Sequence, residues 1–221
     1  CVPTTAYRPP TDTIVQYIVV ERTCPPAEKV VEVSEQKTEE KKLDPITPEY
    51  RALLDTIAWA EGTGHNYNMM MGRMLFTDYS AHPMETGEMP AKGHSFKIKG
   101  KKYWKVFYST AAGRYQFLHR TYKALKEEGF FQTGFSPQEQ DQAAIYLIQK
   151  NEVTQKTLDE AVQEDDAVQQ REEFIEIWHR LSGTWASLPH RKTKRSRYAQ
   201  FANKSDDLQK IFFIYYEQHQ K

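Results

Sequence analysis

The chain has 221 residues, of which 39% are hydrophobic and 13% aromatic, which is enough for one well-packed core with or without an appendage. Its 30 basic and 30 acidic residues give a formal net charge of zero, so no overall field favours nucleic acid or an anionic membrane. The longest apolar runs, such as residues 211–216, are far too short for a transmembrane helix, which needs about 20 residues.

Residues 1–46 differ in composition from the rest of the chain. Residues 2–12 are rich in proline and threonine, and residues 35–42 are mostly charged. Residues 13–20 contain many β-branched side chains and could form a strand. We therefore predict an extended N-terminal arm or tether over residues 1–46 and a globular domain over residues 47–221. An arm that pairs with another protein is the alternative.

The two cysteines, Cys1 and Cys24, are too few for a disulfide scaffold and lack the spacing of a zinc site. A chain that begins with cysteine resembles a mature bacterial lipoprotein. We therefore expect a lipid anchor on Cys1 and a location in the cell envelope or periplasm. The outer membrane is favoured because no aspartate follows Cys1. The alternatives are a truncated chain and a Cys1–Cys24 disulfide.

The globular domain is predicted to open with a helix. Thr47 is suited to the N-cap and Pro48 to the first turn, and apolar residues then recur at helical spacing. Gly62 and Gly64 are expected to end this helix.

A β-hairpin is predicted next, from residues 95–98 and 103–107 joined around Gly100. After Gly113 the chain is mostly helical, and a capping box of Ser-Pro-Gln-Glu at residues 136–139 opens one of the helices. The helices are predicted over residues 136–149, 154–163, 168–181 and 206–218. The fold class is therefore α+β, mainly helical, with one small sheet beside the first helix.

Glu61 is the candidate for acid–base chemistry. It is the last residue before the glycine that ends the first helix, and it lies on the same face as Leu54 and Ile57. Burial and the negative end of the helix dipole both disfavour a carboxylate there, so we expect a raised pKa. A carboxyl that stays protonated near neutral pH is suited to general acid catalysis of glycosidic cleavage. The alternative is a solvated glutamate at a frayed helix end.

Four blocks of sequence carry a family resemblance. In chain order they are IAWAEGT at residues 57–63, LFTDYSAHP at 75–83, STAAGRYQFL at 109–118, and WASLP at 185–189 followed by YAQF at 198–201. In content and in order they resemble the phage lambda endolysin family. The resemblance extends from residue 50 to about residue 215 and leaves the N-terminal arm outside.

This resemblance implies a lysozyme-like fold and a lytic transglycosylase. Such an enzyme cleaves the β-1,4 bond between N-acetylmuramic acid and N-acetylglucosamine in peptidoglycan. The family's single essential glutamate corresponds to Glu61. It protonates the leaving oxygen and then accepts the proton of the sugar's own C6 hydroxyl, which closes onto C1 as a 1,6-anhydro ring.

The role of Asp78 decides between this reaction and ordinary hydrolysis. Hydrolases use two carboxyl groups, either about 5–5.5 Å or about 6.5–9.5 Å apart, and Asp78 is the candidate for the second. A turn residue that makes local hydrogen bonds is one alternative, and a residue that orients the sugar or Glu61 is another. We favour the structural or orienting role, and a hydrolytic muramidase with Asp78 is the alternative function.

Residues of the third and fourth blocks are candidates for substrate contact or support. Tyr115 and Gln116 are expected at a helix start just after Gly113, where they reach the cleft floor, with packing as an equal alternative for Tyr115. Arg114 is expected to form a structural ion pair. Trp185 is a candidate for stacking on a sugar face, and a buried core tryptophan is the alternative.

Two further pairs complete the candidates. Tyr198 and Gln200 resemble family positions near the acid, where Tyr198 would stabilise the oxocarbenium-like centre or hold Glu61. Ser109 and Thr110 are expected to hydrogen-bond the glycan or simply to end the hairpin strand.

Two basic segments depart from the family pattern, and both are expected to flank the cleft. The second, residues 190–197, is expected to contact a polyanion, because peptidoglycan stem peptides carry carboxylates. For the first, a solvated surface is an equal alternative. The first segment covers residues 84–108 and is longer than in the family, and its hairpin carries Lys97, Lys99, Lys101, Lys102 and Lys105.

No cofactor or metal is predicted, since the seven histidines lack metal-ligand spacing and no phosphate loop is present. A nucleic-acid module has only the basic loop in its favour, against a neutral net charge. We expect a monomer that binds peptidoglycan glycan strands. A non-catalytic wall-binding protein of lysozyme fold is the remaining alternative, and Glu61 within its motif argues against it.

Overall fold

A computed structural model describes residues 46–99, 104–196 and 202–221. Within them no helix combines the length and hydropathy that a membrane span requires. Residues 1–45 of the N-terminal arm, with Cys1 and Cys24, lie outside the described residues, and so do Tyr198 and Gln200. The lipid anchor, the tether and the roles of these two residues therefore stay predictions.

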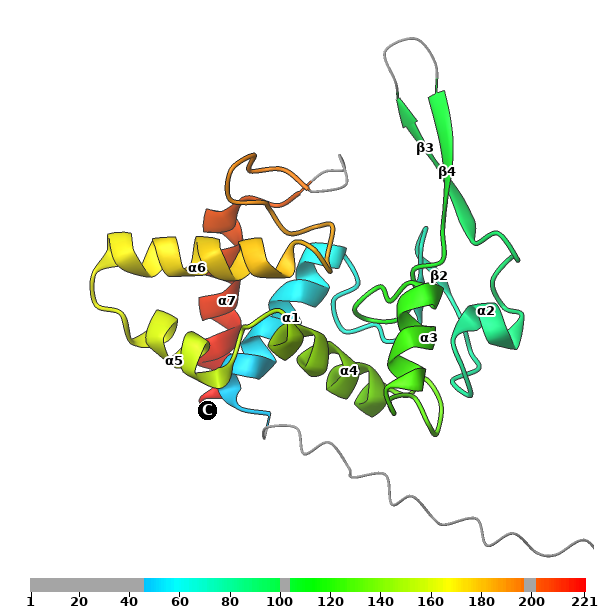
Figure 1. Cartoon of the computed structure of the whole chain (residues 1–221), viewed down its shortest axis with the longest axis horizontal. Helices are drawn as coiled ribbons and strands as arrows, with labels where there is room; N and C mark the ends of the chain where they lie inside the picture. Colours follow the sequence, from blue (N-terminus) through cyan, green and yellow to red (C-terminus); the bar gives the residue numbers. More distant parts are fainter. Residues whose placement is uncertain (1–45, 100–103, 197–201) are drawn as a thin grey trace, which may run out of the picture. The chain divides into compact units, whose positions relative to one another are not determined.

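The described residues form seven helices and two small antiparallel sheets (Figure 1). The helices are α1 (Pro48–Glu61), α2 (Pro83–Thr86), α3 (His119–Glu127), α4 (Pro137–Lys150), α5 (Gln155–Gln163), α6 (Ala167–Leu181) and α7 (Ser205–His219). The strands are β1 (Met69–Met70), β2 (Met74–Leu75), β3 (His94–Lys99) and β4 (Trp104–Ser109). The α+β class predicted from the sequence is confirmed.

Helix α1 begins and ends where the sequence predicts. The Thr47 hydroxyl accepts a hydrogen bond from the Tyr50 amide at 3.3 Å, which satisfies one of the free amides of the first turn. Gly62 has a φ of 73°, in the left-handed region that glycine enters without steric cost, and it ends the helix. Glu61 is therefore held at a defined helix end.

The core of the helical part is built around α1. This helix packs against α4, α5 and α7, and α6 packs against α5 and α7 (Figure 1). The buried face of α1 includes Tyr50, Leu53 and Ile57, none of which is exposed. Phe174 of α6 and Phe212 of α7 meet with their ring centroids 4.9 Å apart. Burial of each such side chain contributes roughly 2–3 kcal/mol, so α1 is anchored on several sides.

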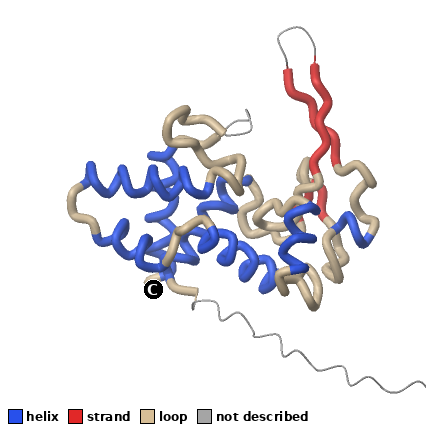
Figure 2. Tube along the Cα trace, viewed as in Figure 1, coloured by secondary structure: helices blue, strands red, loops and turns tan. Residues whose placement is uncertain are grey.

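The sheets differ from the single one predicted. The long hairpin pairs β3 with β4, from His94 opposite Ser109 to Lys99 opposite Trp104 (Figure 2). A second, shorter sheet pairs β1 with β2, and Met70 of β1 also bridges to Ala112. Strands of two residues are too short to show an alternating pattern, which explains why the sequence did not indicate this sheet.

The segment after Gly113 corrects another prediction. Tyr115 and Gln116 do not begin a helix, because α3 starts only at His119. They lie in a tight turn in which the Gln116 amide donates to the Gly113 carbonyl at 3.2 Å. Gly113 and Gln116 have φ values of 81° and 50°, which a right-handed helix excludes.

The capping box before α4 is only half formed. The Ser136 hydroxyl accepts from the Glu139 amide at 3.3 Å, as predicted. The Glu139 carboxylate does not return the bond to Ser136. It accepts instead from the amide and hydroxyl of Thr133, at 3.0 and 3.1 Å, and so fixes the loop that precedes the helix.

Candidate active site

Glu61 lies at the C-terminal end of α1, and its side chain is only partly exposed. One carboxylate oxygen, Oε1, accepts a hydrogen bond from the Ser187 hydroxyl at 2.7 Å. Burial raises the pKa of Glu61 above its ordinary value, and hydrogen bonds from the side chain and backbone of Ser187 oppose that rise. The direction agrees with the sequence-based expectation. Such a carboxyl holds its proton to higher pH than a solvated glutamate does.

Ser187 and Asn203 support this carboxyl, and the sequence analysis named neither as a site residue. The Asn203 amide nitrogen Nδ2 donates to the carbonyls of Ser187 and Ala60 at 3.2 and 3.3 Å. The Asn203 backbone amide also donates to the Ser187 carbonyl, at 2.9 Å. The loop that carries Ser187 is thereby joined to the last turn of α1. The only signal in the sequence was the position of Ser187 inside the fourth block.

The other side of the same helix end is tied to the third block. The Thr63 hydroxyl lies 3.0 Å from the Ala58 carbonyl and 2.5 Å from the Arg114 carbonyl. The Arg114 Nε donates to the Gly64 carbonyl at 2.9 Å. The glycine-rich segment after Glu61 is thus fixed from two directions, which orients the carboxyl.

A buried polar cluster lies behind this segment. Arg114 forms an ion pair with Asp55, as predicted, and Asp55 also contacts His219 Nε2 at 2.7 Å. The Tyr115 hydroxyl donates to Asp141 Oδ1 at 2.6 Å. Because burial and the negative charge of Asp141 disfavour its phenolate, the pKa of Tyr115 is raised well above its ordinary value.

Tyr115 therefore belongs to the core. Only 1% of its surface is exposed, so the prediction that it reaches the cleft floor is replaced by the alternative of packing. The sequence could not decide this point, because a tyrosine has both an apolar ring for the core and a polar tip for a ligand.

Gln116 occupies a different position from its neighbour. Its side-chain Nε2 donates to the carbonyls of Met69 and Gly113 at 3.1 and 2.9 Å. Within the described residues no group donates to its Oε1. The side chain is partly exposed, so this oxygen can accept a hydrogen bond from a sugar amide or hydroxyl.

Trp185 does not offer a face to a sugar. It is 3% exposed, and its indole Nε1 donates to the Tyr115 carbonyl at 3.1 Å. The prediction of sugar stacking is wrong for this reason, and the alternative of a core tryptophan holds. The packing of Trp185 positions the loop that also carries Ser187, two residues further along the chain.

Ser109 and Thr110 make local hydrogen bonds. The Ser109 hydroxyl accepts from the Ala111 amide at 3.2 Å, at the end of β4. The Thr110 hydroxyl accepts from the His119 amide at 3.0 Å, where Leu118 at the N-cap of α3 has no side-chain acceptor to offer. The Ser109 contact is that of the alternative role, the end of the hairpin strand, and the Thr110 contact supports the start of α3.

Asp78 lies in an exposed loop. Its Oδ1 accepts a hydrogen bond from the Ser80 amide at 2.8 Å. Hydrogen bonds from the side chain and backbone of Ser80 lower the pKa of Asp78. Its own backbone amide donates to Glu88 at 3.0 Å. Within the described residues no hydrogen bond links Asp78 to Glu61. This geometry is that of the turn residue considered as an alternative.

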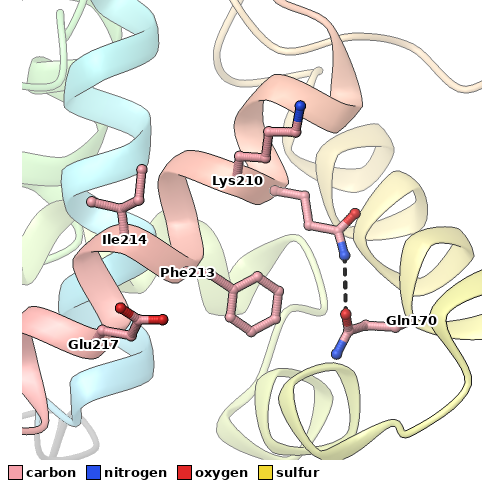
Figure 3. A pocket seen from close by; sticks show the side chains of 6 residues that line it. Gln170, Lys210, Phe213, Ile214 and Glu217 are labelled. Atoms are coloured by element: carbon pink, nitrogen blue, oxygen red, sulfur yellow. Dashed lines mark hydrogen bonds between the residues drawn. The ribbon is translucent and has the colours of Figure 1, made fainter.

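A shallow hollow between α6 and α7 is separate from these residues. Its volume is about 440 Å³, and Lys210, Phe213 and Ile214 lie along it (Figure 3). The Gln209 side chain donates to Gln170 Oε1 at 3.2 Å. None of the candidate site residues is among its described lining.

Comparison with known proteins places these features in a family. A family described as Endolysin matches residues 51–216. The endolysin of Escherichia phage lambda is 32% identical over 171 residues, which cover 74% of this chain and 88% of the relative.

Solved structures give a consistent result. The bacteriophage lambda lysozyme complexed with a chitohexasaccharide superposes with a TM-score of 0.53 at 31% identity, over 77% of this chain and 96% of that chain. A second structure of lysozyme from bacteriophage lambda has a TM-score of 0.53 at 30% identity, with the same coverage of both chains.

Proposed function

This chain belongs to the endolysin family and is a lysozyme-like enzyme that degrades peptidoglycan, and from that premise we propose that it is a lytic transglycosylase whose single catalytic carboxyl is Glu61. The observation that carries the proposal is the setting of Glu61. It is a partly buried carboxyl at a fixed helix end, with a raised pKa and one side-chain donor on Oε1.

In the first step Glu61 acts as the general acid. Its proton passes to the oxygen that links C1 of N-acetylmuramic acid to the next sugar, and the C1–O bond breaks. The resulting centre at C1 is oxocarbenium-like. A carboxyl protonated near neutral pH is required here, and the burial of Glu61 supports that state.

In the second step Glu61 acts as the general base. The carboxylate takes the proton of the C6 hydroxyl of the same sugar, and O6 bonds to C1 to close the 1,6-anhydro ring. Glu61 is protonated again at the end, so no water is consumed. The Ser187 hydroxyl stabilises the transient carboxylate by its hydrogen bond.

Gln116 is the residue we assign to the substrate. Its Nε2 is held by two main-chain carbonyls, which fixes the direction of Oε1. An acetamido N–H or a hydroxyl of the glycan is a matching donor. Asp78 supports the turn that includes Ser80, and the reaction needs no second carboxylate from it.

Mass spectrometry of the soluble products from purified peptidoglycan sacculi tests this proposal. We expect muropeptides that end in 1,6-anhydro-muramic acid. Products with reducing ends would overturn the transglycosylase in favour of a hydrolytic muramidase with a second carboxylate. No products from normal or deacetylated sacculi would favour a wall-binding protein without activity.

Two isosteric substitutions separate the roles of the carboxyls. Glu61→Gln keeps the shape and removes the proton, so we expect kcat/KM to fall by at least about a hundredfold with the fold retained. Asp78→Asn is the matched control and should retain most of the activity. Equal loss in both variants would indicate a pair of carboxylates and would contradict the proposal.

A further inference from the structure

A second hollow lies beside the loop that carries Ser187, and Pro189 of that loop is among its lining. It is formed by α6, by the basic segment that follows Pro189 and by the start of α7, and its volume is about 540 Å³. Four basic and two acidic residues lie among its described lining. These are Arg171, Arg191, Lys194, Lys204, Glu172 and Asp206.

The two arginines already have partners. Arg171 binds Asp206 through Nε at 2.7 Å and Nη2 at 3.3 Å. Arg191 reaches Glu172 and Glu176, both at 3.1 Å. These ion pairs join α6 to α7 and to the basic segment, so the two arginines hold the walls of the pocket together.

The two lysines supply the surplus of positive charge. Among the described residues neither Lys194 nor Lys204 has an ion-pair partner within 4.0 Å, and both are exposed. The hydrogen bond with Arg171 is the main cause that holds the pKa of Asp206 below its ordinary value, and the positive charges of Arg171, Lys210 and Lys194 act in the same direction. An anion in the pocket would therefore meet two ammonium groups that form no ion pair within 4.0 Å with a described carboxylate.

Asn203 connects this pocket to the catalytic carboxyl. It is one of the residues that line the pocket, and its Nδ2 donates to the carbonyls of Ala60 and Ser187. Pro189, also in the lining, follows Ser187 by two residues. The pocket and Glu61 are thus neighbours across one short segment of chain.

We propose that this pocket binds a carboxylate of the peptide stem of peptidoglycan, close to the bond that Glu61 cleaves, with Lys194 and Lys204 as the charged contacts. The inference rests on the proposed function. The acetylated glycan backbone offers few charges, whereas the stem attached to N-acetylmuramic acid carries several carboxylates. The basic segment would then add recognition of the stem to recognition of the sugars.

Binding is measured with the Glu61→Gln variant, which holds the wall without cleaving it. Its affinity is measured by sedimentation for intact sacculi and for sacculi whose carboxyls have been converted to amides, and by calorimetry for soluble, peptide-free glycan strands prepared with an amidase. We expect affinity for intact sacculi to be about threefold to tenfold higher than for the other two, and salt to weaken that preference.

Two charge-removal variants are compared in the same background. Lys194→Ala with Lys204→Ala should abolish the preference for intact sacculi. Lys192→Ala with Arg195→Ala removes the same charge from exposed positions that do not line the pocket, and should keep the preference. Equal affinities for the three substrates, or equal effects of both double variants, would overturn the proposal. Matching thermal unfolding curves would show that both variants fold.

The source of the anion is tested separately. Treatment of sacculi with hydrofluoric acid removes phosphate polymers and leaves stem carboxylates, so the preference should persist. Its loss would overturn the assignment to the stem and indicate a phosphate ligand. If the wild-type chain cleaves no sacculi, the proposed function fails independently of the pocket. The binding comparison then still decides whether the pocket recognises stem peptides.

Discussion

At the scale of single residues, the proposed chemistry depends on the balance of two opposing effects on the pKa of Glu61. Burial raises its pKa, and the hydrogen bonds of Ser187 lower it. In the proposed reaction the carboxyl donates a proton in one step and accepts one in the next, so neither effect can dominate completely. Ser187 is the side chain that adjusts this balance.

Replacement of Ser187 by alanine tests that role. Removing a donor to the charged form raises the pKa of Glu61 further, so the carboxyl stays protonated to higher pH. We expect the alkaline limb of the kcat/KM profile to move to higher pH and kcat to fall about tenfold, as for loss of one hydrogen bond to a charged group.

Ser136→Ala is the matched control for that experiment. It removes the N-cap of α4, so it should lower the free energy of unfolding by about 1 kcal/mol and leave the pH profile in place. An unshifted profile in Ser187→Ala would show that the Ser187 hydroxyl does not act on Glu61.

At the scale of elements, the end of α1 is held by segments distant in sequence. Asn203 joins it to the loop before α7, and Arg114 joins the following residues to the turn before α3. Helix α1 is the rigid element that carries Glu61, and these loops fix the direction of its side chain. The position of Glu61 therefore depends on contacts that are formed only after the helices have packed.

Asn203 is expected to act as a positioning residue. Asn203→Ala should lower kcat with little change in KM, because Ser187 and the helix end lose a shared donor. Asn203→Asp should lower kcat more, since a carboxylate cannot donate and would face the carbonyls of Ser187 and Ala60. Steady-state kinetics on soluble glycan strands measure both. Equal effects on kcat and KM would contradict a positioning role.

The buried pair of Arg114 and Asp55 is expected to dominate local stability. Arg114→Leu leaves a buried carboxylate with less compensation, so the free energy of unfolding should fall by about 3–5 kcal/mol. Arg171→Leu breaks the exposed pair with Asp206 and should cost about 1 kcal/mol or less. Urea denaturation measures both, and similar losses would show that the Arg114 pair is not sequestered from water.

At the scale of the whole molecule, His82 couples folding to pH. Its ring is buried, with Nε2 3.1 Å from the Phe117 carbonyl and Nδ1 accepting from the Met84 amide. Burial lowers the pKa of His82 to about 4, against about 6.5 in an unfolded chain. As pH falls from about 6.5 to about 4, the His82 imidazole binds a proton in the unfolded state but not in the folded state, so the free energy of unfolding falls.

His82→Asn keeps an acceptor at the start of α2 and removes the titrating ring. We expect a lower melting temperature at pH 7 but a flatter decline of stability between about pH 6.5 and 4, where the wild type loses about 3 kcal/mol through His82. The raised pKa values of Glu61 and Asp141 act in the opposite direction in both proteins and cancel in the comparison. His65→Asn is the exposed control, and an equal change in its slope would contradict the assignment.

The sequence by itself determined the local features of this protein. The ends of α1 at Thr47 and Gly62, the long hairpin and the helices after residue 136 follow from capping residues and periodicity, which act over a few neighbouring positions. The raised pKa of Glu61 was also predictable, because its helical phase placed it on the buried face.

Only the tertiary structure decided which polar side chains support Glu61 and which aromatic side chains belong to the core. Ser187 lies 126 positions away in the chain and Asn203 still farther, so no local pattern pairs them with the helix end. Tyr115 and Trp185 proved to be core residues, since an amphipathic aromatic side chain fits a core or a cleft equally well until its neighbours are known. Long-range packing, which local spacing does not encode, made these choices.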